Sequence, residues 1–284
     1  MSERRPDSGV RVCGRSMVRC ITVALVATAL GSLSPATGHA AEVEVRHQEG
    51  VTRGFLVVRT SAGDIVAEGD LLQRARPESV ESRLVFRFRD GSVFDETVVF
   101  SQRRVFTMLR YRLEQRGPTF PDALQVSLER DRDQARGRYS VTARRPGEEE
   151  ERAGGEIDLP LDTYIGMATL ILRNLGTAAT TVHTMAFTPK ATLLQLELAP
   201  EGEESVAAGE RQVSATRYVL KPKLGLLRGA AAALLGKTPA DYRCWIATAG
   251  LPAFVAIDGP LFAGGPIWRI ETVSPRSPAR VLAR

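Results

Sequence analysis

Three residues beyond the N-terminal region carry side chains that often serve catalysis or metal binding: His47, His183 and Cys244. A zinc site needs three or four nitrogen, sulfur or oxygen ligands, usually in paired spacings such as C-x-x-C or H-x-x-x-H. These residues are far apart in the sequence and form no such pair. We therefore expect no metal site and no cofactor, with His47 on the surface and His183 in or beside a strand.

Nucleophilic catalysis needs an activated serine or cysteine beside a positioned base. The sequence contains no G-x-S-x-G motif, no phosphate-binding glycine loop and no dinucleotide-binding glycine pattern. Cys244 lies between Arg243 and Trp245, and a neighbouring arginine can lower the pKa of a thiol, although a single cysteine in a strand is more often a packing residue. A hydrolase would need His47 or His183 near a serine or Cys244, and the sequence singles out no catalytic residue.

Two adjacent carboxylates, Asp95 and Glu96, are the unusual polar residues of a predicted hairpin. Successive side chains of a strand point to opposite faces, so both cannot face solvent if one face is core. A two-residue Asp90-Gly91 loop pairs Phe86 with Asp95, whereas a three-residue loop pairs Phe86 with Glu96. In either register one carboxylate shares the face of Phe86 and Phe88. It is then a polar contact inside a cavity, or else lies at a strand edge or in an ion pair with an arginine.

Large apolar side chains on the predicted core face are candidates for lining a ligand cavity, although such residues more often pack in a core. With the two carboxylates they form the candidate ligand-binding set: Phe86, Phe88, Asp95, Glu96, Ile165, Leu172, Trp245 and Trp268.

Residues 224–235 are apolar or small, and basic residues flank and interrupt them. This pattern is typical of an element at a membrane interface, and it also fits a buried helix with solvated ends. The candidate membrane or partner contacts are Lys221, Lys223, Leu226, Leu227, Arg228 and Lys237.

The first forty residues indicate where the protein works. Five arginines precede an uncharged, mostly apolar run at residues 20–34, and Gly38-His39-Ala40 places small residues at a peptidase site. This order is typical of a secretory signal peptide, and the run is shorter than the ~20 residues that span a bilayer. We expect cleavage after Ala40, a periplasmic or secreted location, one β-rich domain over residues 41–273 and a flexible tail over 274–284.

Composition narrows the class of protein further. The formal net charge is +5, and the leader's arginines supply much of it, so we expect no nucleic-acid partner. Cys244 is the one cysteine after the leader, which excludes an internal disulfide and leaves stability to the core. The sequence does not indicate the oligomeric state.

Apolar and polar residues alternate with a period of two from residue 55 onward, which predicts strands. Residues 102–116 fit a strand or a helix, and a strand is favoured because strands surround them. Residues 148–155 are expected to form an exposed loop. Residues 161–175 show helical spacing between Pro160 and Gly176. The fold class is therefore mainly β: a large curved antiparallel sheet, as a half-barrel or barrel, with one apolar helix (about 161–175) on or in it and a second short helix (about 224–235).

Five short blocks resemble a family of uncharacterised exported bacterial proteins: GFLVVRT at 54–60, FRDGSVFDE at 88–96, FSQRR at 100–104, GPTFP at 117–121 and GGPIWRI at 264–270. The resemblance covers about residues 45–273 and implies no established activity. The architecture also resembles the half-barrel of periplasmic lipoprotein carriers, which implies a curved sheet that holds acyl chains under helices.

Three functions remain open from the sequence. The first is a non-catalytic periplasmic module that binds a lipid or other hydrophobic ligand, which requires a cavity of ~300 Å³ or more. The second is an envelope protein that binds another protein or the membrane surface, which requires an exposed apolar patch. The third is a hydrolase with an unrecognised site.

Overall fold

The alternating pattern forms strands through most of the chain that the structure describes. This computed structural model describes residues 41–274 apart from 133, 189, 210 and 224–239. The first eight strands are β1 (Thr52–Arg59), β2 (Ile65–Ala75), β3 (Val80–Phe88), β4 (Val93–Gln102), β5 (Phe106–Arg116), β6 (Ala123–Arg130), β7 (Arg136–Arg144) and β8 (Glu151–Asp158). Then follow α1 (Ala168–Asn174), β9 (Thr180–Thr188), β10 (Lys190–Ala208), β11 (Arg211–Lys223), β12 (Tyr242–Ala247), β13 (Ala253–Gly259) and β14 (Trp268–Val273).

These strands form one antiparallel sheet of 14 strands within the described residues. The order is β8-β7-β6-β5-β4-β3-β2-β1-β14-β13-β12-β11-β10-β9, so β14 pairs with β1 and joins the two halves of the chain. The edge strands β8 and β9 do not pair with each other, and the sheet is therefore open rather than a closed barrel. The predicted fold class, a large curved antiparallel sheet with an apolar helix, is confirmed.

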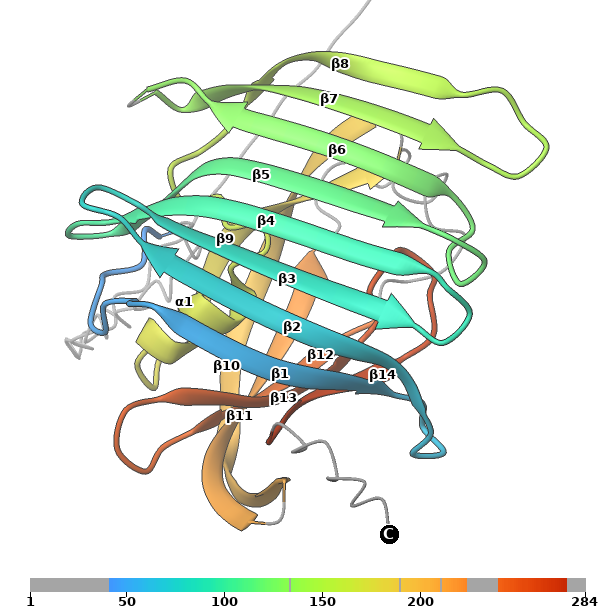
Figure 1. Ribbon diagram of the computed structural model, residues 1–284. Coiled ribbons are helices and arrows are strands. Elements are labelled where there is room, and N and C mark those ends of the chain that lie inside the picture. Colours follow the sequence, from blue (N-terminus) through green and yellow to red (C-terminus); the bar gives the residue numbers. More distant parts are fainter. Residues whose placement is uncertain (1–40, 133, 189, 210, 224–239, 275–284) are drawn as a thin grey trace, which may run out of the picture. The chain divides into compact units, whose positions relative to one another are not determined.

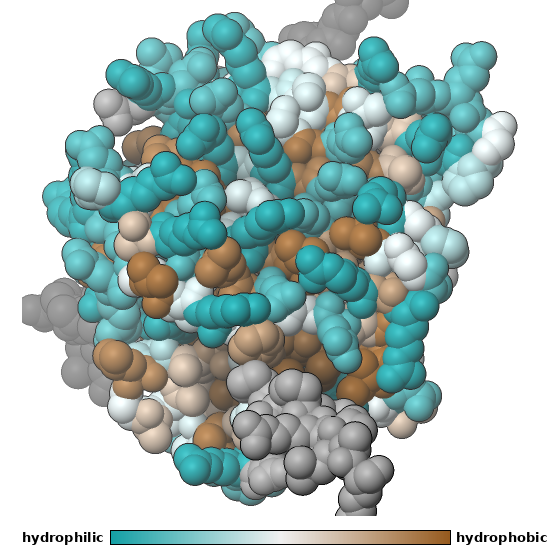
Figure 2. Space-filling view, in the orientation of Figure 1, coloured by the Kyte–Doolittle hydropathy of each residue, from teal (hydrophilic) through white to brown (hydrophobic). Residues whose placement is uncertain are grey.

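The main core lies between α1 and the concave face of the curved sheet (Figure 1). Side chains of α1 pack between strands from both halves of the sheet, because a large twisted sheet curls and encloses its apolar face. Phe100 and Met108 represent the first half in this cluster, and Leu198 and Ile246 represent the second. The outward face of β1–β8 is mainly hydrophilic, with apolar side chains showing between polar ones (Figure 2).

The hairpin between β3 and β4 has a register that differs from both predicted ones. Phe86 pairs with Phe94 rather than with either carboxylate. The loop is closed by Phe88, whose N–H donates to the Ser92 carbonyl at 2.9 Å, and Gly91 has a φ of 84°. The Asp90 carboxylate accepts the Ser92 N–H at 2.9 Å, so side-chain chemistry in the loop shifts the closing pair. Glu96 consequently shares the face of Phe86, and Asp95 does not.

Two further segments differ from the sequence expectation. Residues 151–158, of which part was expected to be loop, form the edge strand β8, because an edge strand accepts polar and glycine-rich sequence. The helix begins at Ala168 rather than near 161. The Tyr164 N–H donates to the His183 carbonyl of β9 at 2.8 Å, so the preceding residues bridge to the sheet instead of continuing the helix.

Among the described residues, no helix is both long enough and apolar enough to cross a membrane. The expected leader (1–40), the second helix (224–235) and most of the tail (274–284) lie outside the described residues.

Candidate functional site

A cavity of about 160 Å³ lies between α1 and the inner face of β1–β4, with β13 and β14 completing its wall. Most of the wall is apolar. The apolar lining residues are Leu56, Leu71, Leu84, Val98, Phe100, Met167, Leu170, Phe254, Ile257 and Ile270. The polar lining residues are Glu49, Gln73, Ser82, Glu96, Thr169 and Arg173.

Two buried polar side chains position the segment that carries α1. The Arg130 guanidinium donates to the Met108 carbonyl at 2.8 Å and to the Pro160 carbonyl at 2.9 Å, which holds the chain before α1 against the sheet. At the end of α1, the Asn174 side chain accepts the N–H of Arg46 at 2.9 Å and that of His47 at 2.7 Å. The helix face that lines the cavity is therefore held from both ends.

One polar side of the cavity wall is an internally paired cluster around Glu49, whose side chain is only 4% exposed. Arg173 donates to Glu49 Oε1 at 2.7 Å, and Gln73 donates to Glu49 Oε2 at 2.6 Å. Arg173 also donates to the Pro252 carbonyl at 2.7 Å. The guanidinium thus joins α1 to the segment before β1 and to the turn between β12 and β13.

Two exposed apolar residues belong to the segments that Arg173 joins. Val51 is 79% exposed and follows Glu49 by two positions, and Leu251 is 76% exposed and precedes Pro252. Among the large apolar residues that the structure describes, these two are the most exposed.

Glu96 is the polar group set among the apolar walls. Its side chain reaches the cavity from β4, where Glu96 pairs with Leu84 and Leu113 on the neighbouring strands. The Tyr111 hydroxyl donates to Glu96 Oε1 at 2.9 Å. Burial raises the pKa of the Glu96 carboxyl, and the hydrogen bond from Tyr111 opposes that rise. Burial and the nearby carboxylate raise the pKa of Tyr111 as well, so the phenol keeps its proton.

Gly166 lies directly against this carboxylate. Its φ is 67°, in the left-handed region that glycine adopts readily, and a Cβ here would lie 3.1 Å from the Glu96 carboxyl carbon. The turn before α1 can approach Glu96 this closely because position 166 has no side chain.

Replacing Glu96 with glutamine is expected to stabilise the protein at pH 8 and to have little effect near pH 4. The raised folded-state pKa means that the parent loses stability as the pH rises from the ordinary value of 4.5 through the folded value. Each unit of pKa difference corresponds to about 1.4 kcal/mol, and glutamine avoids this loss while still accepting the Tyr111 hydrogen bond. Urea unfolding at both pH values measures the difference.

Glu114→Gln is the matched control for this variant, because Glu114 lies on the outward face of the adjacent strand and is half exposed. Equal responses of the two variants to pH would contradict the assignment of Glu96 as the destabilising group.

The candidate ligand-binding residues are divided among several places. Glu96 lines the cavity. Phe86, Phe88 and Trp268 belong to an aromatic cluster with Phe94, Phe120 and Phe262. Ile165 and Leu172 pack in the main core. Asp95 is on the opposite face of β4, where Arg83 Nε donates to its Oδ1 at 2.9 Å. As ligand contacts, all of these residues remain predictions.

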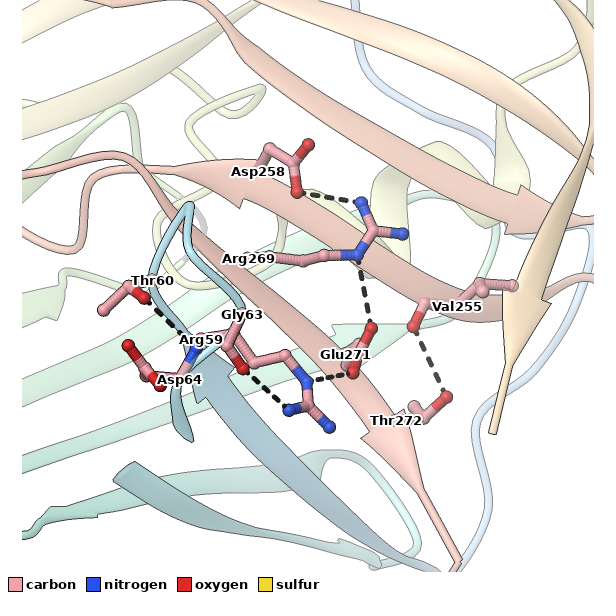
Figure 3. Close-up of polar contacts among 9 residues, drawn as sticks. All are labelled: Arg59, Thr60, Gly63, Asp64, Val255, Asp258, Arg269, Glu271 and Thr272. Atoms are coloured by element: carbon pink, nitrogen blue, oxygen red, sulfur yellow. Dashed lines mark hydrogen bonds and ion pairs between the residues drawn. The ribbon is translucent and has the colours of Figure 1, made fainter. Parts of the chain in front are cut away.

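Trp245 lies on the outward face of β12, beside a chain of charged groups that crosses the sheet. Arg269 links Glu271 at 3.2 Å to Asp258 at 3.1 Å, and Arg59 joins the same Glu271 at 2.6 Å (Figure 3). The Arg269 guanidinium lies 4.9 Å from the centre of the Trp245 ring, and the indole N–H donates to Glu204. Trp245 therefore packs outside the cavity, because its strand neighbours Cys244 and Ile246 occupy the inward face of β12.

The candidate membrane contacts are only partly described. Lys223 forms an ion pair with Glu197 on the neighbouring strand β10. Lys221 lies two residues earlier on β11, opposite Glu197 in the strand register. Leu226, Leu227, Arg228 and Lys237 lie outside the described residues.

His183 uses its ring to hold β9 rather than to face a nucleophile. Its Nδ1 lies 2.9 Å from Asp162 Oδ2, and the backbone N–H of His183 donates to the Asp162 carbonyl at 3.0 Å. Among the described residues, neither His183 nor His47 forms a side-chain hydrogen bond to a serine or to Cys244. No cluster of three potential metal ligands occurs within the described part of the chain either.

The thiol of Cys244 is expected to be unreactive in the folded protein. The residue is fully buried, and burial raises the pKa of the thiol well above its ordinary value. Alkylation followed by peptide mapping should label position 244 only after unfolding in denaturant. Labelling of Cys244 in the native protein at the denatured rate would contradict its burial.

Sequence reasoning missed most of the polar residues around the cavity. Glu49, Gln73 and Arg173 stand among many charged and polar residues of ordinary appearance, and nothing local marks them as partners. Arg173 carried one usable signal, since it is the single charged residue between Ala168 and Leu175 in an otherwise apolar helix. A charged side chain in such a helix must find a partner.

The fold and the site together define an open, curved β-sheet protein with a small, partly open cavity between the sheet and a helix. No family model matches the chain, and no curated protein matches it. Among solved structures it is similar to one described as the crystal structure of a beta-barrel-like protein of domain of unknown function DUF1849 from Brucella abortus. The TM-score is 0.44 and the sequence identity 9%, over 80% of this chain and 98% of that chain.

Proposed function

We propose that the protein is a non-catalytic, exported binding module that holds a hydrophobic ligand in the cavity beneath α1. The observation that carries this proposal is the cavity itself, because it combines apolar walls from the sheet and the helix with a few inward-facing polar groups. Ligand sites generally have this composition: apolar lining for affinity and a small number of polar groups for orientation. The leader over residues 1–40 supports export to the periplasm or beyond.

The volume defines what fits. At about 160 Å³ the cavity is smaller than the ~300 Å³ predicted for a module that binds a lipid or other hydrophobic ligand, so that prediction of its size is wrong and a whole lipid does not fit. Cavities of about 150 Å³ with similar apolar linings bind a molecule the size of benzene. The ligand is therefore a small apolar compound, or the end of a longer chain whose remainder lies outside the cavity.

The test compares binding of 1-hexanol to three versions of the protein by titration calorimetry. The unaltered protein and Ser82→Ala should bind hexanol, because both leave the cavity open. Ser82→Leu should lose binding, because the larger side chain from β3 fills the space. Failure of the unaltered protein to take up hexanol or any other six-carbon compound with the same apolar chain would refute the proposal, and so would hexanol binding by Ser82→Leu equal to that of the parent.

A second candidate function, docking to a membrane surface, is favoured by one observation. The exposed residues Val51 and Leu251 belong to the two segments that Arg173 joins at the cavity wall. Exposed apolar side chains of this kind can insert into the surface of a bilayer. In a flotation assay with anionic vesicles, the parent should rise with the vesicles and a Val51→Ser/Leu251→Ser variant should remain at the bottom of the gradient. Equal flotation of the two proteins would exclude membrane docking through these residues.

A further inference from the structure

The carboxyl of Glu96 has a hydrogen-bond donor but no ionic partner among the described residues. Tyr111 donates to Oε1, and the backbone turn at Gly166 covers one side of the group. No arginine, lysine or histidine in the described part of the chain forms an ion pair with it. The second oxygen, Oε2, accepts no hydrogen bond from a described residue. The Glu96 side chain that carries it lines the cavity.

The other ionised groups of the cavity neutralise each other. Arg173 is engaged by the Glu49 carboxylate and by the Pro252 carbonyl, so its charge is already balanced. Gln73 gives Glu49 a second donor. Within the lining residues, Glu96 is therefore the group whose charge is uncompensated.

A buried carboxylate without a cation is unfavourable, and an incoming cation offsets that loss. We propose that the cavity selects an apolar molecule that bears one protonated primary amine, with the ammonium group against Glu96 and the apolar body against Leu56, Leu84 and Ile270. This inference rests on the proposed function, since it names the chemical class of the same ligand. The volume suits roughly six to eight non-hydrogen atoms, the size of a short alkylamine.

The charge balance also disfavours the opposite class of ligand. A carboxylate ligand in the same position would bring a second negative charge beside the Glu96 carboxylate. Like charges in close contact repel strongly in an apolar surrounding. Arg173 offers such a ligand no free charge, because Glu49 occupies it. A neutral alcohol fits the volume but gains no ionic contact.

The test is titration calorimetry of the purified protein at pH 7 with hexylamine, 1-hexanol and hexanoate, which share one apolar chain. We expect hexylamine to bind about tenfold more tightly than hexanol or better, as a charge-assisted hydrogen bond implies, and hexanoate to bind most weakly. Glu96→Gln should remove the preference for the amine and retain hexanol binding. Glu114→Gln, an outward-facing carboxylate on the next strand, should keep the preference.

The outcomes separate the two proposals. Equal affinity for hexylamine and hexanol, or tighter binding of hexanoate, overturns the amine inference and leaves the binding function intact. Absence of binding by all three compounds overturns the binding function itself. The comparison of the three ligands on the unaltered protein is decisive even if the Glu96 variant fails to fold.

Discussion

Replacing Arg173 with methionine is expected to lower the free energy of unfolding by about 3 kcal/mol. The change leaves Glu49, whose side chain is 4% exposed, without its cation, and it removes the hydrogen bond to the Pro252 carbonyl. Loss of one partner from a buried ion pair is strongly destabilising because the other charge remains buried. We place the effect at the lower end of the usual range, since Arg173 itself is a quarter exposed.

Urea unfolding followed by circular dichroism measures this effect, and two further variants define its cause. Arg173→Met combined with Glu49→Gln should recover much of the lost stability, because the uncompensated charge is gone. Arg83→Met, which breaks the exposed pair with Asp95, should cost less than about 1 kcal/mol. If Arg173→Met destabilises no more than Arg83→Met, the cluster around Glu49 does not hold the cavity wall together.

Replacing Gly69 with alanine is expected to cost about 2–3 kcal/mol. An added Cβ would lie 2.4 Å from Phe86 Cε1 and 2.6 Å from its Cδ1, and Phe86 is completely buried. Because the aromatic cluster around Phe86 is closely packed, the ring cannot move aside without strain. The two residues pair directly across β2 and β3, so the contact is set by the strand register.

The matched control is Gly54→Ala on β1, where the nearest atom to an added Cβ is Leu71 Cβ at an ordinary 3.6 Å. That substitution should be close to neutral. A Gly69→Ala/Phe86→Leu double variant should lose less stability than the sum of the two single variants, because the smaller side chain makes room. Strict additivity, measured by urea unfolding, would show that the close approach is not the cause.

The strands could be anticipated because their signal is local. Period-two alternation decides which side chains share a face, and it holds within each segment whatever the rest of the chain does. The edge strand β8 has no such signal, because a strand at the edge of a sheet needs no apolar alternation, and its residues therefore resemble a loop in the sequence. The predicted helix is longer than α1. The residues before Ala168 have the apolar spacing of a helix, but the backbone of this segment forms hydrogen bonds to β9 instead.

The register of a hairpin depends on details that the pattern does not contain. The sequence predicted that one of Asp95 and Glu96 would face the core, and only the observed closure at Phe88 and Ser92 selected Glu96. A shift of one residue exchanges the two faces of a strand. The pairing of Arg83 with Asp95 on the outward face follows from the same register.

The β architecture, the apolar helix and one inward carboxylate can be predicted from the sequence alone, because each is encoded within a few neighbouring residues. Glu49, Arg173 and Pro252 meet at one wall, and Glu96 lies against Gly166, through contacts that form on folding between distant segments. Those contacts join positions more than fifty residues apart, and they exist because the sheet curls over α1. Local periodicity carries no information about that closure, so the cavity and its polar groups could be recognised only in the folded chain.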